Sequence, residues 1–438
     1  MKRKTLKSLE IWKKSENRKP LILLGARQVG KSYLVDQFAE ESRLNYHKFD
    51  FEKDSSLKKF FETDLSPERI CSELSLYQRA KGLPSISAGD LIFFDEIQEC
   101  PNALASLRYF YENKHNSLVI SAGSLLGDTL TDKFPVGRVE LQKIYPMNFE
   151  EFLWASGNET AIQMFREKSR LLAAHEVLWP LFIDFLFVGG MPEAVKNWFL
   201  NNESRPDQQV MKIQQNILDQ YKMDFAKHSG KTNSEHIVRV FENIPSQLAK
   251  NQDASVKRFQ FKNVLPGQTK FQRLSGPIEW LTQAGLCLPS KIIDGKVEVP
   301  LKAFAKENLF KLFSFDVGLL GRQLELSYLN QKNQNFGLSK GFIAENFVAT
   351  ELTACEKTLY SWQSNSAEIE FLIAHNDLVI PIEIKSGTRT QAKSLKSFVE
   401  KFHPEYSIKL IGNAGGSDSK NLVLPLYYAG CLSEFLQT

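Results

Sequence analysis

The stretch from Leu21 to Ser32, LILLGARQVGKS, constrains the fold of this chain more than any other part of the sequence. Residues 25–32 match G-x-x-x-x-G-K-[ST], the pattern of the Walker A phosphate loop. The apolar residues before it predict a buried strand, and the spacing of Leu34, Val35 and Phe38 predicts a helix after it. A strand, this loop and a helix in that order predict a parallel α/β sheet that holds a polyphosphate at its edge.

The loop itself supplies the predicted phosphate contacts. Gly25 and Gly30 let the backbone curl so that its N–H groups point inward, and the positive end of the following helix faces the same hollow. We expect Lys31 to reach the β and γ phosphates, and the Ser32 hydroxyl to take one Mg²⁺ position. The predicted cofactors are ATP and Mg²⁺, and the nucleotide contacts are Gly25, Ala26, Arg27, Gln28, Val29, Gly30, Lys31, Ser32 and Tyr33. A chance glycine turn is the alternative, and the flanking strand and helix argue against it.

A second apolar run, residues 91–94, ends in Asp95 and Glu96. A buried strand that ends in this pair is typical of a Walker B motif, which places carboxylates at the carboxyl end of a parallel strand. Asp95 is predicted to hold Mg²⁺, directly or through water. Glu96, one residue beyond the strand, is predicted to orient and polarise the attacking water.

Two more residues are candidates for the same reaction. Ser124 follows the apolar run 117–122 and would lie between the two Walker strands, where its hydroxyl could contact the γ-phosphate; a simple turn serine is the alternative. Arg138 follows Gly137 and precedes a strand-like run. Its guanidinium could reach the nucleotide of a neighbouring subunit in a homo-oligomer, whereas a structural salt bridge is the competing interpretation.

These motifs occur together in one known family. The chain resembles the prokaryotic AAA+-type ATPases that carry a C-terminal domain of unknown function, over nearly its whole length. The resemblance rests on the Walker A loop, DEIQECP at 95–101, SAGS at 121–124, GRVELQKIYPMNFEEF from Gly137, GGMPEA at 189–194, YSW at 360–362 and IEIK at 382–385. It implies an ATPase domain, a helical lid, a winged-helix region and a nuclease-like end.

The predicted fold class is therefore α/β: an AAA+-like P-loop NTPase parallel sheet with a helical lid, a winged-helix-like module and a C-terminal restriction-endonuclease-like α/β domain. The expected domain boundaries, in that order, are 1–148, 149–233, 234–304 and 305–438. In the third domain, the patterns predict helices over 234–249, 255–264 and 269–284, followed by a β-hairpin of 287–293 and 296–299.

Basic and aromatic residues are interspersed between Lys250 and Arg273, where Asp253 is the only acid. This local excess of positive charge predicts contact with DNA phosphates. A solvated basic face over an aromatic core is the alternative. The basic residues are Lys250, Lys257, Arg258, Lys262, Lys270 and Arg273, and the aromatic ones are Phe259, Phe261 and Phe271.

The C-terminal residues resemble the PD-(D/E)xK nuclease fold. Glu383 and Lys385 are two apart on a predicted strand, so they share one face. The resemblance implies that these two form the ExK pair, and that Glu345 and Glu370 are the helix and strand acids. The three glutamates would bind a divalent metal, and Lys385 would activate water or neutralise charge. Glu370 stands where that fold usually has aspartate, so an inactive domain that only binds a partner is an equal alternative, and a chance ion-paired strand is another.

Composition adds little about partners, because a net charge of +4 is too small to name one. The five cysteines lie far apart without a C-x-x-C pair and predict reduced thiols. No apolar run predicts a signal peptide or a membrane span, so we expect a cytoplasmic protein without a membrane partner. Two functions remain: an ATP-dependent enzyme that acts on DNA, or an ATP-driven switch whose C-terminal module only recognises a protein partner.

Overall fold

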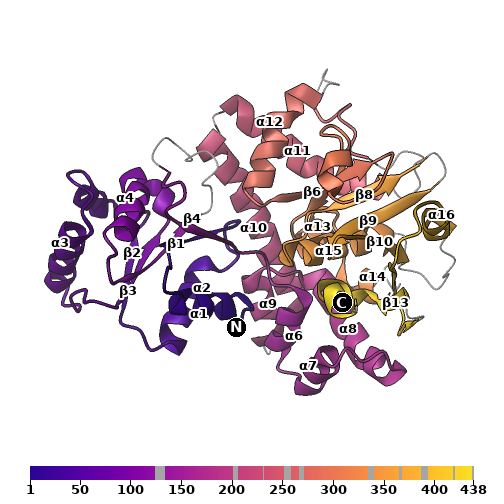
Figure 1. Cartoon of the computed structure of the whole chain (residues 1–438), viewed down its shortest axis with the longest axis horizontal. Coiled ribbons are helices and arrows are strands. Elements are labelled where there is room, and N and C mark those ends of the chain that lie inside the picture. Colours follow the sequence, from indigo (N-terminus) through magenta and orange to yellow (C-terminus); the bar gives the residue numbers. More distant parts are fainter. Residues whose placement is uncertain are drawn as a thin grey trace. The chain divides into compact units, whose positions relative to one another are not determined.

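The computed structural model divides into two compact units, an N-terminal unit (Lys2–Tyr145) and a C-terminal unit (Pro146–Thr438 together with Met1). Figure 1 shows the chain coloured from indigo at the N-terminus to yellow at the C-terminus. The residues that the structure describes are 1–123, 134–200, 206–229, 231–250, 258–265, 271–333, 340–364, 367–385, 393–417 and 420–436.

The N-terminal unit is built on a five-stranded sheet in the order β2-β3-β4-β1-β5, in which every neighbouring pair is parallel. This confirms the predicted parallel α/β sheet. The strands are β1 (Leu21–Leu24), β2 (Tyr46–Asp50), β3 (Leu91–Asp95), β4 (Leu118–Gly123) and β5 (Glu140–Lys143). Because all strands run the same way, their carboxyl ends share one edge of the sheet, and β1 and β3 bring the two Walker motifs to that edge.

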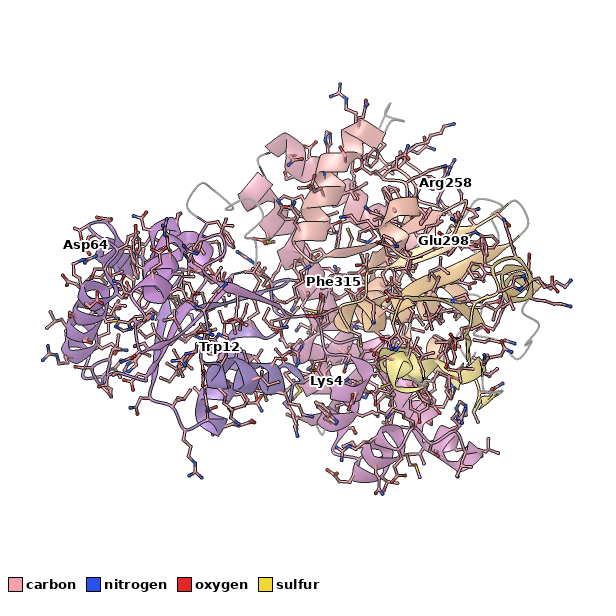
Figure 2. The ribbon with its side chains drawn as sticks, in the orientation of Figure 1. Lys4, Trp12, Asp64, Arg258, Glu298 and Phe315 are labelled. Carbon is pink, nitrogen blue, oxygen red and sulfur yellow. The ribbon has the colours of Figure 1, made fainter. Side chains whose placement is uncertain are left out.

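Helices cover both faces of this sheet. On one face lies α2 (Lys31–Glu41), which also packs against α1 (Thr5–Lys14). The other face forms an apolar core with α3 (Pro67–Ala80), α4 (Pro101–Glu112) and the 3-10 turn η1 (Ser55–Phe61). In α1, Leu6, Leu9 and Trp12 are buried. The Trp12 indole, labelled in Figure 2, donates a hydrogen bond to the Lys19 carbonyl over 2.8 Å.

The C-terminal unit begins with helices, in the region expected to form a helical lid (149–233). They are α6 (Phe149–Ser156), α7 (Glu159–Arg166), α8 (Leu172–Val188), α9 (Pro192–Leu200) and α10 (Pro206–Ser229). Next come α11 (Lys231–Lys250) and α12 (Phe271–Gln283), but the helix predicted for 255–264 is wrong where it is described, because residues 258–265 are irregular. Among the described residues, no helix is long and apolar enough to cross a membrane.

One mixed sheet organises the rest of the C-terminal unit. Its eight described strands have the order β12-β13-β11-β10-β9-β8-β6-β7. They are β6 (Cys287–Ile293), β7 (Phe310–Ser314), β8 (Tyr360–Gln363), β9 (Glu368–His375), β10 (Leu378–Lys385), β11 (Ser407–Ile411), β12 (Gly416–Ser417) and β13 (Asn421–Pro425). The helices of this part are α13 (Val317–Gln323), α14 (Tyr328–Asn333), α15 (Lys340–Ala354) and α16 (Lys393–Phe402).

The hairpin predicted for residues 287–299 is wrong. β6 forms, but it pairs with β7 on one side and β8 on the other, and residues 296–299 form no strand. Both edges of β6 are thus occupied, and Val297 packs into a core with Ile293 and Trp362. The expected third and fourth domains therefore share one sheet, and the boundary between them stays a prediction.

The Gly189-Gly190 pair of the GGMPEA motif has a packing role. Gly190 and Met147 face each other closely, since the Met147 N–H donates to the Gly190 carbonyl over 2.7 Å. A Cβ on Gly190 would lie 2.0 Å from the Met147 carbonyl oxygen. The Gly190 N–H donates to Oδ2 of the buried Asp316 over 2.6 Å. No side chain fits at position 190 unless the backbone moves.

Replacing Gly190 by alanine should therefore lower the stability of the C-terminal unit. Overpacking against backbone should cost about 3 kcal/mol of unfolding free energy. The matched control is Gly276→Ala in α12, where a Cβ would have no atom within 4 Å; it should be neutral or stabilising by up to about 1 kcal/mol. Urea unfolding followed by tryptophan fluorescence measures both. Equal midpoints for the two variants would contradict this account of the motif.

Candidate active site

The phosphate loop joins β1 to α2 at the carboxyl edge of the N-terminal sheet. Its backbone enters the left-handed region at Gln28 (φ 64°) and Gly30 (φ 89°). At Gly25, a Cβ would lie 2.2 Å from the Ile144 carbonyl oxygen, so a side chain cannot be accommodated there. A curl of this kind turns successive N–H groups toward one hollow, and the N-terminus of α2 adds its dipole.

Lys31 is buried against the loop that precedes it. Its Nζ donates to the carbonyl oxygens of Gly25 and Ala26, each over 2.9 Å. Burial lowers the pKa of Lys31 to about 8, and the negative charges of Glu96 and Asp95 oppose that shift. The ammonium therefore already lies inside the loop, where phosphate oxygens can replace its two carbonyl acceptors.

Ser32 and Asp95 meet between α2 and β3. The Ser32 hydroxyl donates to Asp95 Oδ2 over 2.7 Å, and Asp95 is buried. A hydroxyl and a carboxylate oxygen are the ligands that a P-loop NTPase uses to hold Mg²⁺ beside the phosphates. The structure thus brings the two residues of the predicted metal site together, and their oxygen donors fit the ion.

Glu96 follows β3 directly and has a left-handed backbone (φ 51°). Gln98 Nε2 donates to Glu96 Oε2 over 2.5 Å and holds the carboxylate in one orientation. Burial raises the pKa of Glu96, while the Gln98 hydrogen bond and the Lys31 charge oppose the increase. A carboxylate with a raised pKa is a stronger base near neutral pH, as the predicted role requires. Gln98 was not among the predicted site residues.

Arg3 is a further residue that the sequence did not single out. Its side chain is buried, and its guanidinium donates to the carbonyl oxygens of Val29 over 2.9 Å and Tyr145 over 2.7 Å. Arg3 thereby connects the phosphate loop to the segment after β5. An arginine among N-terminal lysines gives no sequence signal of such a contact.

Lys48, on β2, was also missed. Its Nζ lies 3.1 Å from Asp95 Oδ2, the same oxygen that accepts the Ser32 hydrogen bond. β2 and β3 are parallel with Lys48 opposite Phe93, so Lys48 and Asp95 project from one face. The alternation of Tyr46, Lys48 and Asp50 along a strand was the available signal, but the pairing of β2 with β3 was needed to use it.

The other predicted residues of this site lie elsewhere. Tyr33 is exposed on the first turn of α2, and Ser124 lies outside the described residues. Arg138 precedes β5 and so lies at the amino edge of the sheet, opposite the phosphate loop. Its Nε donates to Glu112 Oε1 over 2.9 Å, and its guanidinium lies 6.0 Å from the Tyr111 ring centroid. Arg138 cannot reach the nucleotide of its own chain, and a contact with a neighbouring subunit stays a prediction.

The nuclease-like residues of the C-terminal unit lie on adjoining elements. β9 and β10 are antiparallel, and Ile382 lies opposite Phe371, so the next residues along the two strands, Glu383 and Glu370, also face each other. Lys385 lies two residues beyond Glu383 on β10. Glu383 Oε1 pairs with Lys385 Nζ over 2.7 Å, and its Oε2 accepts the Leu395 N–H over 3.0 Å. Burial, and then the charge of Glu345, raise the pKa of Glu370 to about 8.

A second lysine, which the sequence did not indicate, enters this acidic cluster. Lys311 of β7 is buried and pairs with Glu345 over 3.3 Å and also with Glu368. Burial lowers the pKa of Lys311, but the charges of Glu345 and Glu368 outweigh that effect and raise the pKa above its ordinary value. In the part of the chain that the structure describes, no three histidine, cysteine or acidic side chains are arranged to hold a metal ion. The ligand role of Glu345, Glu370 and Glu383 stays a prediction.

The basic stretch between Lys250 and Arg273 has an aromatic interior. Phe259, Phe261 and Phe271 all pack against Phe310 of β7, with ring centroids 5.8 to 6.1 Å apart. These rings form an aromatic cluster in which Phe259 and Phe310 are buried, while Phe261 and Phe271 are half-buried. Residues 251–257 and 266–270, which contain Lys257 and Lys270, lie outside the described residues.

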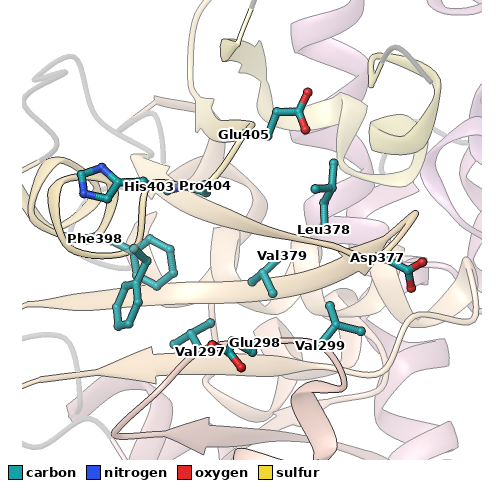
Figure 3. Close-up of a pocket in the computed structure, with 11 residues that line it drawn as sticks. Val297, Glu298, Val299, Asp377, Leu378, Val379, Phe398, His403, Pro404 and Glu405 are labelled. Carbon is teal, nitrogen blue, oxygen red and sulfur yellow. The ribbon is translucent and has the colours of Figure 1, made fainter.

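A pocket of about 580 Å³ lies in the C-terminal unit, and none of its described lining residues is a predicted site residue. Figure 3 shows Leu378 and Val379 at the start of β10 with Phe398 of α16, which supply apolar lining. Carboxylates from Glu298, Asp377 and Glu405 stand around it, and among the described lining residues His403 is the only basic one. Such a surface repels phosphates, so it is unsuited to nucleic acid.

Comparisons with known proteins identify three segments. Residues 17–153 match a family model described as an AAA domain. Residues 180–330 match the domain of unknown function DUF8612, and residues 340–427 match DUF4143. No curated protein matches the chain.

Solved structures with distant similarity include the following three. A chain of Drosophila ORC bound to DNA is 15% identical over 73% of this chain and 94% of its own length, with a TM-score of 0.29. A structure of katanin self-assembly (17% identity, 35% and 51% coverage, TM-score 0.21) and C. elegans PCH-2 (13%, 45% and 61%, TM-score 0.26) also match. These TM-scores are too low to carry an argument about this chain.

The phosphate loop, the Ser32–Asp95 pair and Glu96 all lie within the first matched segment. The chain therefore carries an AAA domain of the P-loop ATPase type, followed by the domains of unknown function DUF8612 and DUF4143.

Proposed function

We propose that this protein is a Mg²⁺-dependent ATPase that hydrolyses ATP at the phosphate loop of its N-terminal unit. The hydrogen bond between Ser32 and Asp95 carries the proposal, because it joins the Walker A helix to the Walker B strand beside the buried Lys31. The AAA domain match over residues 17–153 supports it.

The site residues have separate tasks in this proposal. The loop N–H groups and Lys31 bind the β and γ phosphates, and Ser32 and Asp95 hold the metal. Mg²⁺, when bound, offsets the negative charge that develops on the phosphates. Glu96 orients a water molecule and accepts its proton, while Gln98 keeps the carboxylate aimed. A role for Arg138 at a neighbouring subunit's nucleotide and a role for Ser124 at the γ-phosphate stay predictions, as does the lid function of residues 149–233.

ATP hydrolysis was expected to drive either an enzyme that acts on DNA or a switch that recognises a protein partner. The contacts in the C-terminal unit favour the switch, which needs no nuclease activity. Each proposed metal ligand there already has a protein partner: Glu345 has Lys311, Glu383 has Lys385, and Glu370 accepts the Ile384 N–H over 3.2 Å. Lys311 brings a buried positive charge to the place where a nuclease of this kind keeps its divalent ion. We infer that the C-terminal unit recognises a partner, with DNA bound through basic residues as the remaining alternative.

DNA binding by the basic stretch has a direct test. Arg258 and Lys262 are exposed, so Arg258→Glu with Lys262→Glu should weaken DNA binding. The slope of the logarithm of the binding constant against the logarithm of the salt concentration should become shallower by about two, one for each lost phosphate contact. The control is Lys302→Glu with Lys396→Glu, an equal charge change at exposed positions of the same unit. Fluorescence anisotropy of labelled DNA at several salt concentrations measures binding. Identical curves for wild type and both variants would leave a protein partner as the output.

Cleavage is measured in the same samples with Mg²⁺ or Mn²⁺. We expect none from the wild type. Metal-dependent cleavage that Lys385→Ala removes would contradict the inference and restore the nuclease. ATP turnover with and without single- and double-stranded DNA completes the test, because an ATPase coupled to DNA should change its rate when DNA binds.

A further inference from the structure

We propose that Lys48 is a resident cation of the ATPase site, which neutralises Asp95 in the nucleotide-free chain and has to release it before Mg²⁺ binds. The inference rests on the proposed function and assigns that site a positioning residue. It goes beyond the two Walker motifs, because Lys48 belongs to neither and reaches the site from β2, an edge strand of the sheet.

Lys48 lies between two carboxylates. Its Nζ is 3.1 Å from Asp95 Oδ2 and 3.8 Å from Asp36 Oδ1. It also lies 5.3 Å from the centroid of the Phe93 ring, which shields one side of the ammonium. Asp36 is one helical turn after Ser32 on α2, and its Oδ1 accepts a hydrogen bond from the Tyr46 hydroxyl over 2.7 Å. The lysine can therefore pass from one carboxylate to the other with a small movement.

The two carboxylates differ in their surroundings. The Asp95 side chain is 6% exposed, whereas that of Asp36 is 48% exposed. A buried carboxylate without a positive partner is costly, and Lys48 supplies a direct ion pair while no metal is present, in addition to the charge of Lys31. The exposed Asp36 is hydrated and does not need the lysine to the same extent. Lys48 is therefore held at Asp95 until another cation takes its place.

Lys48 and a metal ion compete for the same oxygen, Asp95 Oδ2, and this competition is how Lys48 affects metal binding. Asp95 Oδ2 already accepts the Ser32 hydroxyl and faces the ammonium, and a metal ion at these oxygens would be repelled by a cation about 3 Å away. Free Mg²⁺ brings no compensating charge. Mg²⁺ that enters with ATP brings the phosphate charges, which can offset the repulsion and favour the shift of Lys48 to Asp36. Lys48 thus makes the metal enter with the nucleotide.

Metal binding by the nucleotide-free full-length chain tests this without any turnover. Mn²⁺, followed by electron paramagnetic resonance, serves as the probe. Lys48→Met should strengthen Mn²⁺ binding about three- to tenfold, and adding Asp95→Asn should abolish the gain. Lys48→Arg keeps the cation and should stay near wild type. Lys53→Met is the matched control, since Lys53 pairs with Asp50 just beyond β2 but is 81% exposed.

Asp36 provides a test of opposite sign. When Asp36 no longer attracts Lys48, the lysine should stay paired with Asp95. Asp36→Asn should therefore raise, by about two- to fivefold, the Mg²⁺ concentration needed for binding of a fluorescent ATP analogue. In a Lys48→Met background the same change should have no effect. A persistent effect there would mean that Asp36 acts through its own charge, which would overturn the proposed shift.

The failures of the two proposals are distinguishable. A wild-type chain that does not bind the ATP analogue at any Mg²⁺ concentration removes the proposed ATPase function. A chain that binds it, with Mn²⁺ affinity unchanged or weakened by Lys48→Met, overturns only the role of Lys48. Melting curves of each variant verify that it is folded, and Lys48→Arg and Asp36→Asn, which keep similar side-chain volumes, serve if Lys48→Met unfolds.

Discussion

Replacing Glu96 by glutamine should lower the turnover number for ATP about 10²- to 10⁴-fold, the usual contribution of a positioned general base. The amide keeps the shape of the side chain but cannot accept the proton of the attacking water. Binding of ATP should change by less than about threefold, because the proposed role of Glu96 is to contact the water and not the phosphates. Steady-state phosphate release gives the turnover number, and a fluorescent ATP analogue gives the affinity.

Glu99→Gln is the matched control for Glu96→Gln. Glu99 belongs to the same 3-10 turn after β3, but its carboxylate pairs with Lys58 over 3.6 Å instead of facing the phosphate loop. Its removal should leave turnover within about twofold of wild type, as expected for a surface pair. If Glu99→Gln were as damaging as Glu96→Gln, the loss would reflect damage to the turn, and the base would have to be another residue.

Replacing Lys31 by alanine should weaken Mg·ATP binding about 10²-fold or more, because charge-assisted hydrogen bonds to the phosphates are worth about 3 kcal/mol together. Hydrolysis should fall to background as well. The chain should stay folded, since in the nucleotide-free state Lys31→Ala removes the hydrogen bonds to the Gly25 and Ala26 carbonyls and the attraction of the ammonium to Glu96 and Asp95, and no large apolar side chain.

The control for Lys31→Ala is Lys7→Ala, which removes an exposed lysine of α1 in the same unit. Equilibrium binding of the fluorescent ATP analogue compares the two variants with wild type. Wild-type affinity in Lys31→Ala would contradict the assignment of the phosphate loop. Loss of affinity in both variants would point to a general effect of charge.

The ATP site was predictable from sequence because its core is local. The phosphate loop, Asp95 and Glu96 are each defined by a few adjacent residues whose strand and helix contexts can be recognised from hydrophobic spacing. The parallel sheet follows from the same strands. Lys48 and Arg3 were not predictable, because their contacts depend on which strand pairs with β3 and on where the N-terminal segment returns to the loop.

The C-terminal sheet illustrates the opposite case. Asp294-Gly295 after an apolar run is a strong hairpin signal, yet β6 pairs with β7 and β8, which lie beyond the adjacent segment. Alternation along the strand correctly put Glu383 and Lys385 on one face, where they form an ion pair, since alternation depends only on strand geometry. Lys311 reaches the acidic cluster from β7, and no local pattern in the sequence connects it to Glu345 or Glu368.

Phosphate release from ATP by the purified full-length chain, with Mg²⁺ or with excess EDTA, tests the central claim most directly. The account predicts release that saturates with ATP, requires Mg²⁺ and is lost in Lys31→Ala and Glu96→Gln. Release by wild type that equals the protein-free background, or that persists in Lys31→Ala, would contradict it.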